Sequence, residues 1–129
     1  MVTVDSVTRQ MDTFNEAFHV GDPAMAGACL AANAIIWHNT DGVELTAEGF
    51  LVGMKAVTDL MPVRRVQVIR RDVLADCCVQ QQAIVGLNSQ NRPVRILTCI
   101  VCRFAVDGRI ERIDEYLDSA AMAQLTAKD

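Results

Sequence analysis

The N-terminal part of the chain shows apolar residues at helical spacing. They recur every three or four positions, at Val7, Met11, Phe14 and Phe18. This spacing predicts an amphipathic helix over residues 4–19. Gly21 suits its C-cap, and the Asp22-Pro23 pair is typical of an N-cap followed by the first turn of another helix. We therefore expect a second, short helix that fades near residue 33.

A short apolar run, AIIWHN at residues 34–39, predicts a strand that ends on a histidine and leads into the Asp41-Gly42 turn. Thr46 is then placed to cap a third helix, which Pro62 would end. The apolar stripe of this helix consists of Phe50, Met54, Val57 and Met61.

The second half of the chain is rich in Val, Ile, Thr and Arg. Strand-like segments cover residues 63–75, 78–88, 93–106 and 109–118, and the short links between them favour antiparallel neighbours. Ser119 is a candidate cap for a last short helix. The order ααβαββββα, without repeats or linkers, predicts one α+β domain over residues 1–129, with N-terminal helices packed on one face of a curved antiparallel sheet.

The third of these strands is apolar on both faces. Val94, Ile96, Thr98, Ile100, Cys102 and Phe104 alternate with the outward-facing Leu97, Cys99 and Val101. The helices can cover only one face, so the other needs a second cover. We predict a homodimer formed through Leu97, Cys99 and Val101.

Composition narrows the class of protein. The hydrophobic fraction is 51%, which leaves apolar surface for a lined pocket or a subunit interface. The net charge of −4 gives no basic patch for nucleic acid, and we interpret Arg64, Arg65, Arg70 and Arg71 as a solvated sheet face. No segment is long and apolar enough for a membrane span. The absence of a signal peptide and the odd number of five cysteines favour free thiols and a cytoplasmic location.

The sequence contains no pattern for a metal ion or a nucleotide. Its two histidines lie far apart without a carboxylate at ligand spacing, and it has neither a phosphate loop nor a dinucleotide fingerprint. We therefore expect no cofactor.

Two segments resemble a known family. The element order, the stretch FHVGDPAMAGACLAANAIIWHN and the closing DGRIERIDEYLDSAAM are similar to the nuclear-transport-factor-2-like (NTF2-like) superfamily, in particular to its SnoaL-like polyketide cyclase and ketosteroid isomerase branch. The resemblance covers nearly the whole chain. It implies a cone-shaped (cystatin-like) fold around an apolar pocket and a dimer through the outer sheet face. It also implies either acid–base chemistry on apolar substrates or ligand binding alone.

The resemblance is informative when it is followed residue by residue. The position of the general base of ketosteroid isomerase holds His38, whereas the two oxyanion donors are replaced by Phe14 and Ile100. Steroid isomerisation by that mechanism is therefore excluded. The last aspartate of limonene-epoxide hydrolase aligns with Glu115, but its Arg–Asp partners are absent. The acid of SnoaL-like cyclases also corresponds to Glu115.

These positions define a candidate site. We predict that His38 and Glu115 form a catalytic pair, in which burial lowers and the carboxylate raises the pKa of the histidine. Two alternatives are a half-buried structural histidine, and a register in which Asp114 points inward in place of Glu115. Gln82 would orient a carbonyl group or water, unless residues 80–82 form an exposed ladder. The candidates for core or pocket wall are Phe14, Phe18, Trp37, Phe50, Met54, Ile100 and Ile113.

The function expected from these residues is a small cofactor-independent enzyme. It would move a proton on an apolar cyclic or polyketide-like molecule, as an isomerase, cyclase, dehydratase or hydrolase. The alternative is a non-catalytic small-molecule-binding or assembly module with the same fold.

Overall fold

The computed structural model describes residues 2–128 and confirms the α+β class. The helices are α1 (Val4–Val20), α2 (Pro23–Ala28), α3 (Ala47–Leu60) and the 3₁₀ helix η1 (Ser119–Thr126). The strands are β1 (Leu30–His38), β2 (Glu44–Thr46), β3 (Val63–Val73), β4 (Cys77–Leu87), β5 (Pro93–Phe104) and β6 (Ile110–Leu117). Among these residues no helix is long and apolar enough to cross a membrane.

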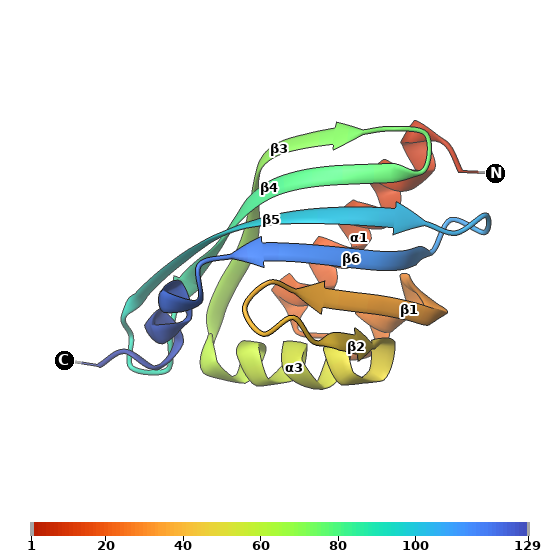
Figure 1. The fold of residues 1–129 in the computed structure, drawn as a ribbon. Coiled ribbons are helices and arrows are strands. Elements are labelled where there is room, and N and C mark those ends of the chain that lie inside the picture. The colour runs from red at the N-terminus through yellow and green to blue at the C-terminus, as the bar shows by residue number, and fades with distance from the viewer. Residues whose placement is uncertain (1, 129) are drawn as a thin grey trace.

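The strands form one open, curved sheet in the order β2-β1-β6-β5-β4-β3. Figure 1 shows α1 passing behind the strands, α3 beside β2, and η1 near the bent ends of β4 and β5. All helices thus gather around the concave side of the sheet. Side chains of α1, α3, η1 and the sheet line a hollow between these elements.

The helix ends follow from local chemistry. Thr3 and Ser6 form a reciprocal capping box at the start of α1, and Gly21 ends it with the left-handed backbone that glycine adopts without strain (φ 73°). The Asp22 carboxylate accepts the free N–H groups of Ala24 and Met25, at 3.0 and 3.2 Å. The first helix thus matches its predicted bounds to within one residue, whereas α2 starts as predicted but ends at Ala28, well before the expected fading near residue 33.

Four features differ from the sequence-based expectation. β1 begins at Leu30, within an alanine-rich stretch that has helical character in sequence, and the short β2 was not predicted. β1 pairs with β6 in parallel, so the sheet is not wholly antiparallel. The last helix is a 3₁₀ helix capped by Asp118 rather than Ser119. The start of β1, the short β2 and the parallel β1–β6 pair all depend on pairing between distant segments. Such pairing leaves no pattern in the local sequence.

The two faces of β5 differ as the alternation predicted. Its inward residues are buried, whereas Leu97 is 57% exposed and Cys99 and Val101 are half-buried. The dimer through this outer face remains a prediction. The interpretation of the arginines as a solvated face is wrong for Arg64 and Arg71. Arg64 donates hydrogen bonds to the carbonyls of Phe18 and Met61, and Arg71 points toward α1.

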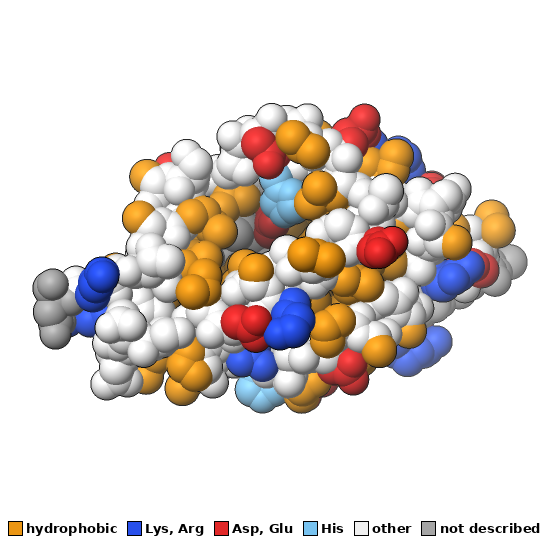
Figure 2. Space-filling view, turned by 90° about the horizontal axis from the view of Figure 1, so that it is seen from below, with side chains coloured by type: hydrophobic (Ala, Val, Ile, Leu, Met, Phe, Trp, Pro, Cys, Tyr) orange, Lys and Arg blue, Asp and Glu red, His pale blue; other side chains and the backbone are white. Residues whose placement is uncertain are grey.

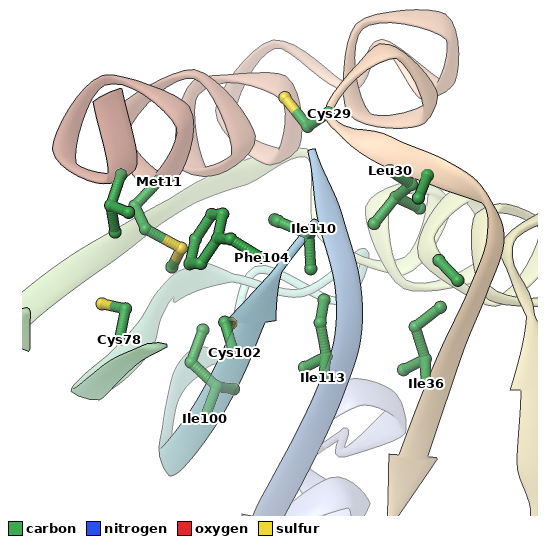
Figure 3. Packing of buried hydrophobic residues seen from close by; sticks show 13 residues of the cluster. Met11, Cys29, Leu30, Ile36, Cys78, Ile100, Cys102, Phe104, Ile110 and Ile113 are labelled. Atoms are coloured by element: carbon green, nitrogen blue, oxygen red, sulfur yellow. The ribbon is translucent and has the colours of Figure 1, made fainter. Parts of the chain in front are cut away.

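The largest core cluster borders the hollow. Figure 3 shows side chains from α1, β1, β4, β5 and β6 converging there, with Met11 directed at Phe104. Ile36, Ile100 and Ile113 belong to this cluster and also line the hollow. One wall of the hollow is therefore formed by side chains of the close-packed core.

Candidate functional site

The hollow is a pocket of about 410 Å³, within the usual range for small-molecule sites. Its lining residues are mostly apolar and come from α1, α3, η1 and all strands. Figure 2 views the molecule from below and shows hydrophobic side chains around a hollow, with a histidine beside an acidic side chain. His38 and Glu115 are the only ionisable side chains among the described residues that line the pocket.

The structure places nearly all of the candidate residues in this pocket. Its lining includes Phe14, Phe18, His38, Phe50, Met54, Gln82, Ile100, Ile113 and Glu115. Trp37 is the exception, and the prediction that it lines the pocket is wrong. Successive strand residues face opposite sides, so Trp37 points away from the pocket and packs edge-on against Tyr116, with ring centroids 5.3 Å apart.

His38 and Glu115 come together because β1 and β6 are neighbouring parallel strands whose C-terminal ends lie side by side. The two residues are register partners, and His38 Nε2 lies 2.9 Å from Glu115 Oε1. Their side chains are 22% and 18% exposed. The pair is therefore shielded from bulk water, yet open to the pocket.

The side chain of Asn39 fixes this register. Its Nδ2 donates to the Leu117 carbonyl at 3.1 Å, and its Oδ1 accepts from the Leu117 N–H at 2.9 Å. The Asn39 N–H donates to the Glu115 carbonyl at 3.1 Å. Asn39 thus continues the β1–β6 ladder beyond the last residue of β1 and holds the ends of both strands together.

The structure also decides between the two acidic residues of β6. Glu115 faces the pocket, whereas Asp114 points to the other side and accepts a hydrogen bond from Arg112 Nε at 3.0 Å. Glu115 lies two residues after the buried Ile113, so both side chains are on the inward face of β6.

The Glu115 carboxylate controls the protonation of His38. Its hydrogen bond raises the pKa of His38 above the ordinary value; burial of the ring opposes this, while the charges of Glu115 and Asp41 add to the rise. With Nε2–H donated to Glu115, a neutral His38 has its lone pair on Nδ1. Among the described residues Nδ1 has no hydrogen-bond partner. Such a ring can accept a proton, and the carboxylate then stabilises the imidazolium.

A second polar region lies further into the pocket. Gln82 of β4 and Thr98 of β5 are directly opposite each other, and each is 6% exposed. Residues 80–82 do not form the exposed glutamine ladder considered as an alternative. Gln82 is buried, and Gln80 is fully buried. The alternation along β5 predicts that Thr98 faces inward, but threonine is a common strand residue and its type alone does not indicate a role.

Aromatic side chains form the helical wall. The Phe14 ring of α1 stacks on the Phe50 ring of α3, with centroids 5.8 Å apart and planes inclined by 20°. This contact joins the two helices across the pocket and offers flat apolar surface to a ligand.

No group of three His, Cys, Asp or Glu side chains within residues 2–128 is arranged to hold a metal ion. The five cysteines are all free thiols.

The geometry can be compared with that of known proteins. No protein-family model matches the chain, and no curated protein matches it. Solved structures do match over almost their whole length, and they define the class of fold. The chain has the NTF2-like fold, which SnoaL-like polyketide cyclases share.

Three solved structures illustrate the likeness. IdmH of Streptomyces antibioticus, a candidate polyketide cyclase, is 21% identical with a TM-score of 0.81, over 94% of this chain and 99% of that one. An NTF2-like protein of unknown function from Burkholderia pseudomallei is 18% identical with a TM-score of 0.79, over 95% and 98%. A candidate SnoaL-like polyketide cyclase from Shewanella denitrificans is 9% identical with a TM-score of 0.74, over 93% and 96%. The resemblance found in the sequence is confirmed at the level of the fold.

Proposed function

We propose that this protein is a small cofactor-independent acid–base enzyme that acts on an apolar cyclic or polyketide-like molecule. The observation that supports it is the His38–Glu115 pair, 2.9 Å apart inside an otherwise uncharged pocket. A charged pair at such a place is costly unless it is hydrogen-bonded, and it is well suited to moving a proton.

The proposed chemistry uses only residues of this chain. Neutral His38 accepts a proton from the substrate at Nδ1, while its Nε2–H stays bound to Glu115. The carboxylate keeps the ring in this tautomer and stabilises the positive charge that develops, as the acid of a catalytic triad does. Return of the proton to another substrate atom completes an isomerisation, a cyclisation or a dehydration. The candidate cyclases with this fold support this reaction type.

The experiment measures proton transfer without knowledge of the natural substrate. Cyclic ketones, aromatic polyketides and terpenoid ketones are incubated with the protein in D₂O, and deuterium uptake beside the carbonyl is followed by mass spectrometry. We expect protein-dependent exchange of at least one class, with a loss of about 100-fold or more in His38→Gln. Glu115→Gln should be slower than the wild type because the imidazolium loses its partner.

The matched control is His19→Gln. This second histidine is exposed on α1 and contacts the Arg64 carbonyl through Nδ1 at 3.0 Å, outside the pocket. It should leave the exchange unchanged. Exchange that persists in His38→Gln, or an absence of exchange above the buffer rate for every class, would exclude this function.

A binding module is the second candidate, and the mainly apolar lining favours it. In that case His38 would only shape the pocket. Ligand affinity would then be constant between about pH 5 and pH 8, whereas a catalytic histidine in contact with the ligand makes the affinity depend on pH.

We further propose that the protein is a homodimer through the outer face of β5. Leu97 is 57% exposed there, and the neighbouring Ile69 and Tyr116 are also exposed apolar residues of that face. A second copy would remove this apolar surface from water.

A further inference from the structure

Thr98 carries the only buried side-chain oxygen or nitrogen atom within residues 2–128 that lacks a hydrogen-bond partner, its Oγ1. The side chain lines the pocket and is 6% exposed. A buried hydroxyl without a partner is destabilising, so its presence calls for an explanation. A ligand oxygen in the pocket would be a suitable partner.

Gln82, the neighbour of Thr98 across the β4–β5 pair, presents an amide to the same region. Its orientation is set by a chain of hydrogen bonds that begins at Arg71. The Arg71 guanidinium donates from Nε to Gln80 Oε1 at 2.8 Å and from Nη1 to Asp12 Oδ1 at 2.8 Å. Gln80 Nε2 in turn donates to Gln82 Oε1.

The direction of this chain leaves one group free. Arginine can only donate hydrogen bonds, so the oxygen of Gln80 must face Arg71 and its nitrogen must face Gln82. The Gln82 oxygen therefore faces Gln80, and the Gln82 NH₂ group points away from this chain of hydrogen bonds. Among the described residues no partner of Gln82 Nε2 is found. The pocket wall thus offers two hydrogen-bond donors, the Gln82 amide and the Thr98 hydroxyl.

We propose that Gln82 Nε2 and Thr98 Oγ1 together bind a neutral carbonyl oxygen of the substrate. This inference rests on the proposed function and narrows its substrate class to carbonyl compounds. A carbonyl oxygen has two lone pairs and can accept a hydrogen bond from each donor, which suits a ketone, quinone or ester group. A carboxylate does not fit, because Glu115 is negative and no Lys or Arg is among the described lining residues.

The sheet register places this donor pair relative to the His38–Glu115 pair. Glu115 is opposite Ile100 on β5, and Thr98 lies two residues further along the same face. Gln82 is on the next strand, so it lies two strand spacings across the sheet and two residues along it from Glu115, roughly 12 Å in all. A substrate that reaches both pairs is a planar or fused-ring molecule with its carbonyl oxygen at β4–β5.

The test compares two probes that differ only in this oxygen. They are 2-acetylnaphthalene and 2-isopropenylnaphthalene, in which a CH₂ group replaces the carbonyl oxygen. Binding of each is measured by calorimetry. We expect the wild type to bind the ketone about fivefold or more tightly than the hydrocarbon. The infrared carbonyl stretch of the bound ketone should also lie below its value in hexane.

The key variant is Thr98→Val, which keeps the shape of the side chain. The ketone preference should fall severalfold, while the free energy of unfolding stays equal or rises because the lost hydroxyl had no partner. Gln82→Glu keeps the acceptor for Gln80 but removes the donor, so it should also lower the preference. Thr40→Val is the matched control, since Thr40 lines the pocket away from the β4–β5 pair and should leave the preference unchanged.

Arg71→Met tests the positioning role of the hydrogen-bond chain. Without the guanidinium the side-chain amides of Gln80 and Gln82 can flip, so Gln82 no longer always presents its NH₂ group. The carbonyl stretch of the bound ketone should then move back toward its value in hexane. A merely structural role of Arg71 would lower stability without this spectral change.

Equal or undetectable affinity for the two probes, or a preference that survives in Thr98→Val, would overturn the inference. These outcomes are separate from the fate of the enzyme proposal. A ketone preference without any deuterium exchange supports the donor site and excludes the catalysis. Exchange with equal binding of both probes supports the catalysis and excludes the donor site.

Discussion

The interaction between His38 and Glu115 is accessible to a double-mutant cycle. The variants are His38→Gln, Glu115→Gln and the combination of the two, each of which keeps a polar side chain of similar length. The coupling energy is the part of the destabilisation that is not additive. It isolates the pair from the cost of altering the pocket wall.

The structure gives the size of this energy. Hydrogen bonds that involve a charged group contribute about 1.5–3 kcal/mol, whereas exposed ion pairs contribute about 0.2–1 kcal/mol. The two side chains are 22% and 18% exposed, so solvent screens the pair only in part. We expect about 1.5 kcal/mol when His38 is protonated. A neutral ring keeps the hydrogen bond but loses the charge attraction, which leaves about 0.5 kcal/mol.

The pH dependence has a definite sign. The pKa of His38 is raised in the folded protein, mainly by its hydrogen bond to Glu115. Folding therefore favours the protonated ring. This contribution to stability is complete below the pKa of histidine in the unfolded chain, and it is lost as the pH rises through the folded-state pKa.

Urea unfolding at about pH 5 and about pH 9 measures the cycle at both ends. The control is the Lys55–Asp59 pair on α3, whose side chains are both 64% exposed at a distance of 2.9 Å. Its coupling energy should stay below about 0.5 kcal/mol at both values. A His38–Glu115 coupling near zero throughout, or one that grows as the pH rises, would refute the reasoning.

Four further predictions concern the dimer, the sheet and α3. Leu97→Arg should convert the proposed dimer to a monomer in analytical ultracentrifugation, whereas arginine at Val106, an 88% exposed loop position, should not. Gly86→Ala should destabilise the fold by about 3 kcal/mol or more in urea unfolding, because a Cβ there would lie 1.8 Å from a backbone oxygen of β3. Gly53→Ala, where nothing lies within 4 Å, should stabilise α3 by up to about 1 kcal/mol. Ile96→Ala should cost about 2–5 kcal/mol by the same measurement, since this side chain is 1% exposed.

The sequence predicts the site well where local rules apply. Alternation along β6 was sufficient to place Glu115 rather than Asp114 on the inward face, because Ile113 and Leu117 set the parity. The Asp41-Gly42 turn indicates where the first strand ends, and this places His38 at the end of that strand. The placement of Glu115 needs only the two-residue period of a strand, and that of His38 needs only the turn that ends the strand.

Other parts of the site depend on contacts between distant segments. The pairing of β1 with β6 could not be inferred from the sequence, because the two strands lie far apart in the chain and no short turn links them. The prediction that Trp37 lines the pocket follows from its place beside His38, although strand parity puts it on the opposite face. The role of Arg71 depends on Asp12, which lies on α1, and a charge pattern within β3 contains no information on that contact.

The parallel pairing of β1 with β6 also has a consequence for the order of folding. β1 comes first among the strands in the chain, and β6 comes last. Until β6 is in place, β1 can pair only with the three residues of β2. Closing so long a stretch of chain costs conformational entropy before any contact rewards it, and such distant pairings slow folding. We therefore expect the His38–Glu115 contact to form late in folding, so that the chain acquires its candidate chemistry only as the sheet is completed.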